Sequence, residues 1–155
     1  MKCFYLVGYH GCGKTTQANR VESKHPIFNF IGGKRGLDDI KSVKKLLSEI
    51  MKSKQDMFIH GCIFQTEPTL EKLARLTDLN IIVMRTLPRI VEQRSIERET
   101  ANYNLQKFTA HYSYIKKLPA WKQKYKFNLY IVDNNQSEDE VFREIEKICV
   151  PSSVL

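Results

Sequence analysis

Acidic residues are missing from a long stretch of this 155-residue chain, because no Asp or Glu occurs between Thr100 and Val132. Long apolar runs are missing too, since no stretch approaches the roughly 18 residues of a membrane-spanning helix. The glycine-rich segment that begins at Gly8 leaves no room before it for a signal peptide. The sequence therefore predicts a globular protein without a membrane anchor or a secretory leader.

Cysteines are few and widely spaced. The four residues form neither a C-x-x-C pair nor a zinc-ligand pattern; they are Cys3, Cys12, Cys62 and Cys149. We expect free thiols, which are typical of a reducing compartment, and therefore a cytoplasmic protein.

Composition is that of an ordinary soluble domain, with 42% hydrophobic and 27% charged residues. No repeat, low-complexity segment or linker divides the chain, so we expect one domain over residues 1–150 and a short tail over residues 151–155. The formal net charge of +8 suggests an anionic partner, although a generally basic surface would give the same value.

A phosphate-binding motif follows the first apolar run. Its pattern, G-x-x-x-x-G-K-[ST], is complete, and Thr16 extends it; the eight residues are Gly8, Tyr9, His10, Gly11, Cys12, Gly13, Lys14 and Thr15. In such a loop the glycines let main-chain N–H groups point at phosphate oxygens, and the helix that follows directs its positive end at the same anion. Lys14 would place a charge on the outer phosphates, and Thr15 would offer its hydroxyl to Mg²⁺. The motif predicts binding of a nucleoside triphosphate, ATP, together with Mg²⁺.

Short apolar runs alternate with helical patterns along the rest of the chain. The predicted strands cover residues 2–7, 27–31, 57–60, 81–84 and 129–132. Amphipathic helices are predicted between and after them, at about 15–24, 38–52, 66–76, 88–99, from 105 onward, and from a capping box at Ser137-x-x-Glu140. Pro119 is expected to break or kink the helix that starts near residue 105. This alternation predicts an α/β fold with a five-stranded parallel sheet and helices on both faces.

Three features together resemble the P-loop nucleotide and polynucleotide kinase superfamily. The first is the loop itself, continued as Gly-Lys-Thr-Thr-Gln in a manner similar to thymidylate kinases. The second is the fourth strand followed by Pro88 and spaced arginines, and the third is the ending from Tyr130 to Val141. The resemblance implies a single P-loop kinase domain with strand order 2-3-1-4-5 and the active site at the carboxyl ends of the strands. GTPases are disfavoured, because no Asn-Lys-x-Asp sequence occurs.

The resemblance implies a lid after the fourth strand. Arg94 and Arg98 are four residues apart, so they share a helix face, and a lid would bring them onto the transferring phosphoryl group. The alternative is a solvated helix face on which Glu97 and Glu99 are the partners of these arginines.

Acidic candidates for a catalytic base follow the second strand. In polynucleotide-type kinases a carboxylate in this region accepts the proton of the acceptor hydroxyl, and Asp38 and Asp39 occupy it here. One of the two could equally be a helix N-cap.

The third strand departs from the family pattern, which usually ends in an acidic residue near the metal. Residues 57–60 contain no acid, and Asp56 precedes them. Glu67 is a possible substitute, while His60 is either a polar contact in the site or a satisfied buried histidine.

The acid-free stretch is rich in lysine and aromatic residues, a combination that suits phosphates and unpaired bases. Its lysines are Lys107, Lys116, Lys117, Lys122, Lys124 and Lys126. Part of the aromatic set, including Phe108 and Tyr112, also fits a buried stripe. The first hypothesis is therefore a kinase that phosphorylates a hydroxyl group in nucleic acid, with DNA as the first choice, at a 5′ end or on a hydroxymethylated base. The alternatives are a (deoxy)nucleoside monophosphate kinase and a non-catalytic ATP-binding module.

Overall fold

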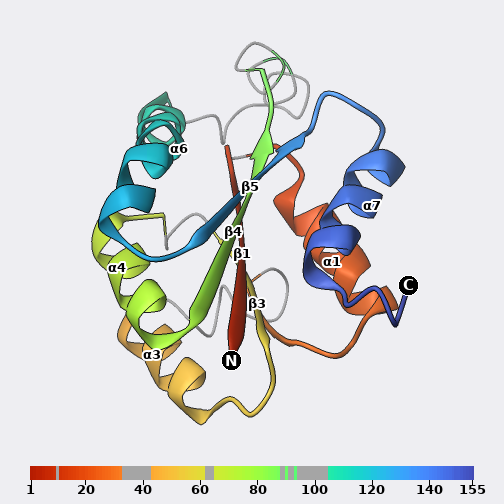
Figure 1. Cartoon of the computed structure of the whole chain (residues 1–155). Helices are drawn as coiled ribbons and strands as arrows, with labels where there is room; N and C mark the ends of the chain where they lie inside the picture. Colours follow the sequence, from red (N-terminus) through yellow and green to blue (C-terminus); the bar gives the residue numbers. More distant parts are fainter. Residues whose placement is uncertain (10, 33–42, 62–64, 88–89, 91–92, 94–104) are drawn as a thin grey trace.

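The structure is a computed structural model, and it describes residues 1–9, 11–32, 43–61, 65–87, 90, 93 and 105–155, with residues 105–110 as backbone only. Five strands form one sheet: β1 (Lys2–Gly8), β2 (Asn29–Ile31), β3 (Met57–His60), β4 (Asp78–Arg85) and β5 (Asn128–Asp133). The helices given with their bounds in the described residues are α1 (Lys14–Lys24), α3 (Val43–Lys52), α4 (Glu67–Leu76), α6 (Leu105–Lys124) and α7 (Glu138–Cys149) (Figure 1).

The sheet is entirely parallel and has the order β2-β3-β1-β4-β5, which confirms the predicted fold class and strand order. β1 lies in the centre, and all its residues after Lys2 are buried. This is why the strand reads as a continuous apolar run rather than an alternating one. β2 is shorter than the predicted strand because it begins at Asn29.

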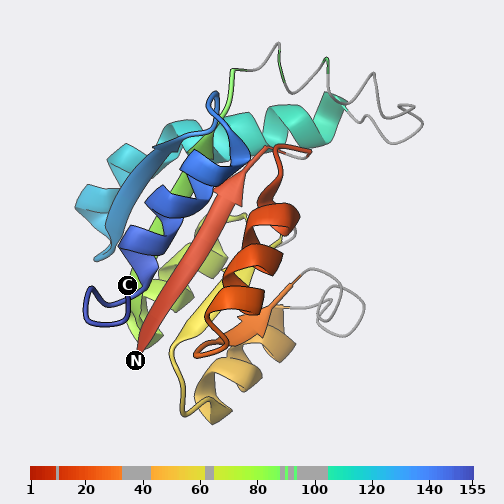
Figure 2. The ribbon, with the colours of Figure 1, turned by 90° about the vertical axis from the view of Figure 1, so that its right-hand side faces the viewer.

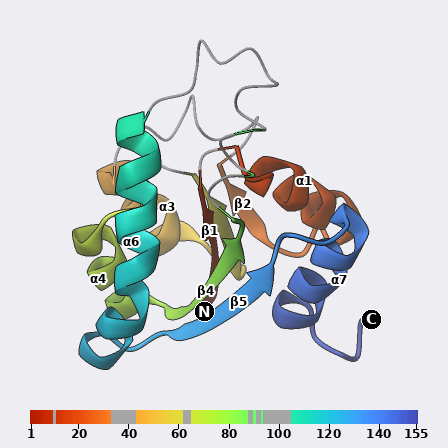
Figure 3. The ribbon, with the colours of Figure 1, turned by 90° about the horizontal axis from the view of Figure 1, so that it is seen from above.

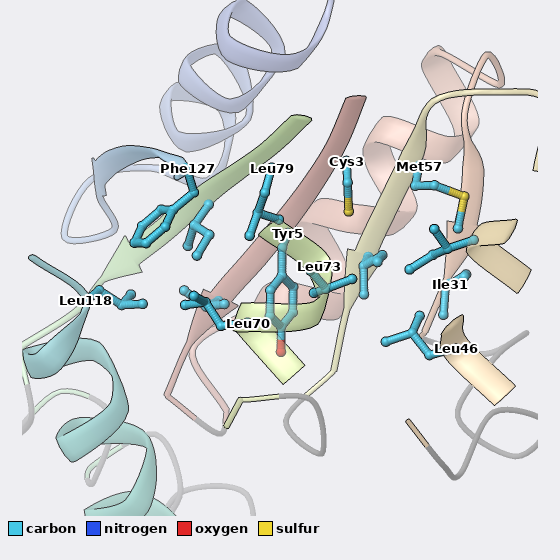
Figure 4. Close-up of a cluster of buried hydrophobic side chains, with 14 of the residues drawn as sticks. Cys3, Tyr5, Ile31, Leu46, Met57, Leu70, Leu73, Leu79, Leu118 and Phe127 are labelled. Atoms are coloured by element: carbon cyan, nitrogen blue, oxygen red, sulfur yellow. The ribbon is translucent and has the colours of Figure 1, made fainter. Parts of the chain in front are cut away.

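Helices cover both faces of the sheet. α1 and α7 lie on one face, and α3, α4 and α6 lie on the other (Figure 3). Successive residues of β1 point to opposite faces, so Phe4 and Leu6 pack toward α1 and α7 while Tyr5 packs toward α4. Figure 4 shows the ring of Tyr5 beside Leu70 and Leu73 of α4.

Local sequence signals explain several helix ends. Ser137 caps α7 as its capping box predicts, since the Ser137 hydroxyl accepts a hydrogen bond from the Glu140 amide at 3.2 Å. α4 starts after Thr66, as predicted, with proline in its first turn. α6, in contrast, continues through Pro119 as one helix to Lys124, so of the predicted break or kink the break does not occur.

Two further expectations have structural counterparts. Within the described part of the chain, no helix combines the length and the apolar character needed to cross a membrane. Cys3, Cys12 and Cys149 are buried and form no disulfide among the described residues, in agreement with the prediction, whereas Cys62 lies outside those residues.

Candidate active site

The phosphate-binding loop lies at the centre of the sheet's carboxyl edge. It joins β1 to α1, and Figure 2 shows α1 starting beside the arrowhead of β1 and running back along that strand next to α7. The neighbours of β1 are β3 on one side and β4 on the other, so the chain changes direction across the sheet at this point. Open parallel sheets bind their ligands at such switch points.

The start of α1 is built to receive an anion. Gly13 is its N-cap, with φ of 98°, in the left-handed region that favours glycine. No side chain caps this end, and the first turn of α1 contains no acidic residue. The first-turn N–H groups and the positive end of the helix dipole therefore remain available to a phosphate group.

Lys14 supplies the charge inside the loop. Its side chain is only 7% exposed, and its ammonium donates hydrogen bonds to the carbonyls of Gly8 at 2.8 Å and Tyr9 at 2.7 Å. No carboxylate forms an ion pair with it among the residues that the structure describes. A buried cation whose partners are neutral is a strong attractor for a phosphate.

The structure describes only part of the predicted site. It places Gly8, Tyr9, Gly11, Cys12, Gly13, Lys14, Thr15 and Thr16 in one loop and the first turn of α1. Thr15 is exposed at the start of that helix, where its hydroxyl would hold Mg²⁺ beside bound phosphates. His10, Asp38, Asp39, Arg94 and Arg98 lie outside the described residues, so their roles stay predictions.

His60 ends β3 close to Lys14. The imidazole is 4% exposed, and burial, followed by the positive charge of Lys14, lowers the pKa of His60 from 6.5 to about 4. The side chain is therefore neutral near pH 7, and it adds no second positive charge to the loop. The sequence left open whether His60 is a polar contact in the site or a buried histidine. The structure shows that it is buried and that it also lies near Lys14 of the loop.

Glu67, the possible acidic substitute, has its hydrogen-bond partners on and after α6 rather than in the loop. Glu67 accepts hydrogen bonds from the Tyr125 hydroxyl at 2.7 Å and from Lys124 at 3.2 Å, and these partners lower its pKa. Asp56 accepts from the main-chain amide of Lys2, at the amino end of β1 and far from the loop. No cluster of three or more metal-ligating His, Cys, Asp or Glu side chains occurs in the described ranges. Among the described residues, Thr15 is the candidate that the motif offers as a ligand for Mg²⁺ beside bound phosphates.

Gln65 contacts the loop, although nothing in the sequence pointed to it beyond a polar residue just before the helix that starts at Glu67. Its side-chain oxygen accepts a hydrogen bond from the Gly8 amide at 3.2 Å, and the residue is buried. Its amide nitrogen is also buried, and it has no hydrogen-bond partner among the described residues. Gln65 thus fixes the start of the loop.

Asn134 contacts the loop from the other side. Its side-chain nitrogen donates to the Cys12 carbonyl and to the Thr86 hydroxyl, both at 2.7 Å. Asn134 and Gln136 line a pocket of about 150 Å³ together with Gly11, Gly13 and Gln17 of the loop and α1.

The predicted lysine surface follows α6. Lys116, Lys117, Lys122, Lys124 and Lys126 are all exposed, whereas the side chain of Lys107 lies outside the described residues. Lys116 lies near the phosphate loop, because its ammonium is over the ring of Tyr112 and that ring stacks on the loop residue Tyr9. Lys126, in contrast, precedes Asn128, which pairs with Asn80 near the amino end of β4, so it lies toward the amino ends of the strands.

Tyr112 corrects one sequence-based expectation. The helical spacing placed it in a buried stripe with Phe108, but its side chain is 41% exposed. The buried face of α6 is formed instead by Tyr114 and Leu118, which pack against the core, and Tyr112 lies off that face.

Comparison with known proteins identifies the fold. No family model matches the chain, and no curated protein sequence matches it. Among solved structures, the YorR protein from Bacillus subtilis, in complex with phosphorylated GDP, is 14% identical, with 94% of each chain covered and a TM-score of 0.68. A gluconokinase from Sinorhizobium meliloti is 14% identical, with 92% of this chain and 88% of that chain covered and a TM-score of 0.60.

A deoxyadenosine kinase from M. mycoides, with the products dCMP and dCDP bound, is 13% identical, with 96% of this chain and 98% of that chain covered and a TM-score of 0.59. These similarities extend over nearly the whole of both chains. The protein therefore has the P-loop kinase fold, as the resemblance implied.

Proposed function

We propose that this protein is an ATP-dependent kinase that transfers the γ-phosphoryl group to a hydroxyl group on a nucleic acid. The observation that carries the kinase assignment is the buried ammonium of Lys14 within a loop that leads to an uncapped helix N-terminus. Phosphoryl transfer needs little covalent chemistry from a protein. It needs neutralised charge and an acceptor placed in line with the leaving group, and this loop supplies the first.

The proposed roles divide among a few residues. Lys14 and the N–H groups of the loop bind the β- and γ-phosphates, and Thr15 holds Mg²⁺, which neutralises further phosphate charge when bound. We propose that Arg94 and Arg98 stabilise the transferring group, with a loss of about 10³-fold or more in rate if the acting arginine is removed. Asp38 or Asp39 is proposed to accept the proton of the acceptor hydroxyl.

The charge of the chain supports a nucleic-acid acceptor. The net charge is +8, and the five described lysines along and after α6 are exposed in a segment that contains no acid. Lys124 is the one among them with a carboxylate partner, Glu67, in the described ranges. An exposed strip of this kind favours contact with successive phosphates, at a 5′ end or beside a hydroxymethylated base in DNA.

A second candidate is a kinase of free nucleotides or other small hydroxyl compounds. The solved structures favour it, since a gluconokinase and a deoxyadenosine kinase align over 88% and 98% of their own lengths. A P-loop kinase fold as compact as this one is therefore compatible with a small acceptor. Chain length therefore does not separate the two candidates.

The decisive experiment incubates the protein with MgATP labelled at the γ-phosphate and a panel of acceptors. The panel contains mononucleotides, 5′-hydroxyl oligonucleotides, hydroxymethylated DNA, gluconate and shikimate. Label on oligonucleotides or modified DNA supports the first candidate, and label confined to small molecules contradicts it. Transfer to no acceptor, with ATP still bound, would favour a non-catalytic ATP-binding module. Lys14→Ala serves as the control that must lose transfer.

A further inference from the structure

An exposed tyrosine on α6 lies directly outside the phosphate loop. The ring of Tyr112 on α6 stacks on the ring of Tyr9, with centroids 6.2 Å apart and planes 12° apart. Tyr9 is a loop residue and only 6% exposed, and its carbonyl accepts the hydrogen bond from Lys14. Tyr112 is 41% exposed, so aromatic surface remains open directly beside the residue that contacts Lys14.

A cation accompanies this aromatic surface. The Lys116 ammonium, one helical turn after Tyr112, lies 5.7 Å from the centroid of the Tyr112 ring. Lys116 and Lys117 are both exposed, and the sequence contains no acid within fifteen residues on the C-terminal side of Lys117. Lys116 has no carboxylate partner among the described residues. Proteins bind single-stranded nucleic acid by this pairing of an aromatic platform with a nearby cation.

We propose that Tyr112 and Lys116 bind an unpaired base of the acceptor strand and its adjoining phosphate. The base stacks on the open part of the Tyr112 ring, and Lys116 neutralises the phosphate. This inference rests on the proposed nucleic-acid kinase function and narrows its substrate to a single-stranded or flipped-out acceptor. A base inside a duplex would have to leave its stack before it could reach this surface.

The stack on Tyr9 gives the platform a fixed place relative to the reaction. The Tyr9 carbonyl accepts a hydrogen bond from Lys14, and the Tyr9 ring stacks on Tyr112. A base on Tyr112 would therefore be held at the edge of the phosphate loop. The Tyr9 stack and the proposed base stack also occupy different parts of the Tyr112 ring. Tyr9 covers one part, and the acceptor base would cover the exposed part.

The test measures binding of a fluorescein-labelled single-stranded oligodeoxynucleotide by anisotropy, without ATP, at several salt concentrations. Tyr112→Leu removes the platform and Tyr112→Phe keeps it. We expect Tyr112→Leu to weaken oligonucleotide binding about 10-fold and Tyr112→Phe to bind like the wild type. Lys116→Ala should reduce the slope of log Kd against log salt by about 0.7, the value for one phosphate contact on a single strand.

Tyr130→Leu is the matched control. Tyr130 is also an exposed tyrosine, but its neighbour Leu129 packs on the α6 side of the sheet, so Tyr130 points to the opposite face. The Tyr130→Leu variant should therefore bind the oligonucleotide as the wild type does. Thermal melting of each variant verifies that it is folded, and calorimetry with MgATP verifies that its donor site is intact.

Three outcomes overturn the proposal in distinguishable ways. If Tyr112→Leu binds the oligonucleotide as the wild type does, while the wild type phosphorylates it, the platform is wrong and the nucleic-acid kinase function stands. If Tyr112→Leu loses ATP affinity but not oligonucleotide affinity, the tyrosine only supports the loop. If the wild type neither binds nor phosphorylates oligonucleotides but does phosphorylate mononucleotides, the proposed nucleic-acid function itself fails, and this inference with it.

Discussion

The side-chain amide of Asn134 donates a 2.7 Å hydrogen bond to the carbonyl of Cys12, which ties the turn after β5 to the middle of the phosphate loop. We expect Asn134→Ala to lower the free energy of unfolding by about 1–3 kcal/mol, because the buried carbonyl and the Thr86 hydroxyl lose their donor. A less constrained loop should also bind ATP about 10-fold more weakly. Thermal melting and calorimetry with MgATP measure the two effects.

Asn135→Ala is the control for this variant. The Asn135 side chain contacts Asp133 and the Leu87 amide in the exposed part of the same turn. Its removal should change the free energy of unfolding by no more than about 0.5 kcal/mol and leave ATP binding intact. Equal behaviour of the two variants would show that Asn134 does not support the loop.

Lys14→Met should abolish phosphate transfer while the protein stays folded. The substitution keeps an unbranched side chain in the buried position and removes only the charge that would neutralise the donor phosphates. We expect a loss of at least about 100-fold in the rate of transfer. A radiolabel assay measures this rate. Lys147→Met, at an exposed position on α7, changes the net charge by the same amount and should retain full activity.

Two glycine substitutions should separate backbone strain from lack of space. At Gly13, with φ of +98°, an added Cβ has its nearest neighbour 4.0 Å away, so Gly13→Ala meets strain alone and should cost about 1–2 kcal/mol. At Gly32, with φ of +113°, the added Cβ would lie 1.9 Å from the His60 carbonyl oxygen. Gly32→Ala should therefore cost more than about 3 kcal/mol. Urea unfolding measures both, and an equal cost would contradict the distinction.

His60 should make stability depend on pH. Its pKa is lowered from 6.5 to about 4 in the folded protein, so between these values the unfolded chain binds a proton that the folded chain does not. The stability that His60 contributes is complete above about pH 6.5 and is lost as the pH falls toward 4, by up to roughly 3 kcal/mol. Melting temperatures measured from pH 4.5 to 7.5 should fall more steeply for the wild type than for His60→Gln. Parallel curves would show that His60 titrates normally.

The sequence predicted the fold because the information for it is local. The central strand is a continuous apolar run, the helices carry apolar stripes at helical spacing, and the phosphate motif sits between the first strand and the first helix. The capping box at Ser137 lies within four residues, so it too was readable from the chain. Strand order came from the resemblance rather than from periodicity, and the sheet confirms it.

The supports of the loop could not be predicted in the same way. Gln65 contacts Gly8 across 57 positions of the chain, and Asn134 contacts Cys12 across 122. A polar residue near a strand end gives no sign of which distant group it bonds. The position of Glu67 is a related case, since its pairing with Lys124 and Tyr125 depends on how α6 packs against α4.

The rings of Trp121 and Tyr114 meet edge to face, with centroids 5.4 Å apart, on the inner side of α6. Trp121 is the single tryptophan of the chain, so indole emission reports on this one position without ambiguity. Its fluorescence should change when α6 detaches from the sheet during unfolding, whether the α6 side of the sheet or the α1 and α7 side unfolds first. The protein thus contains its own fluorescent probe for α6, the helix that bears the lysine surface.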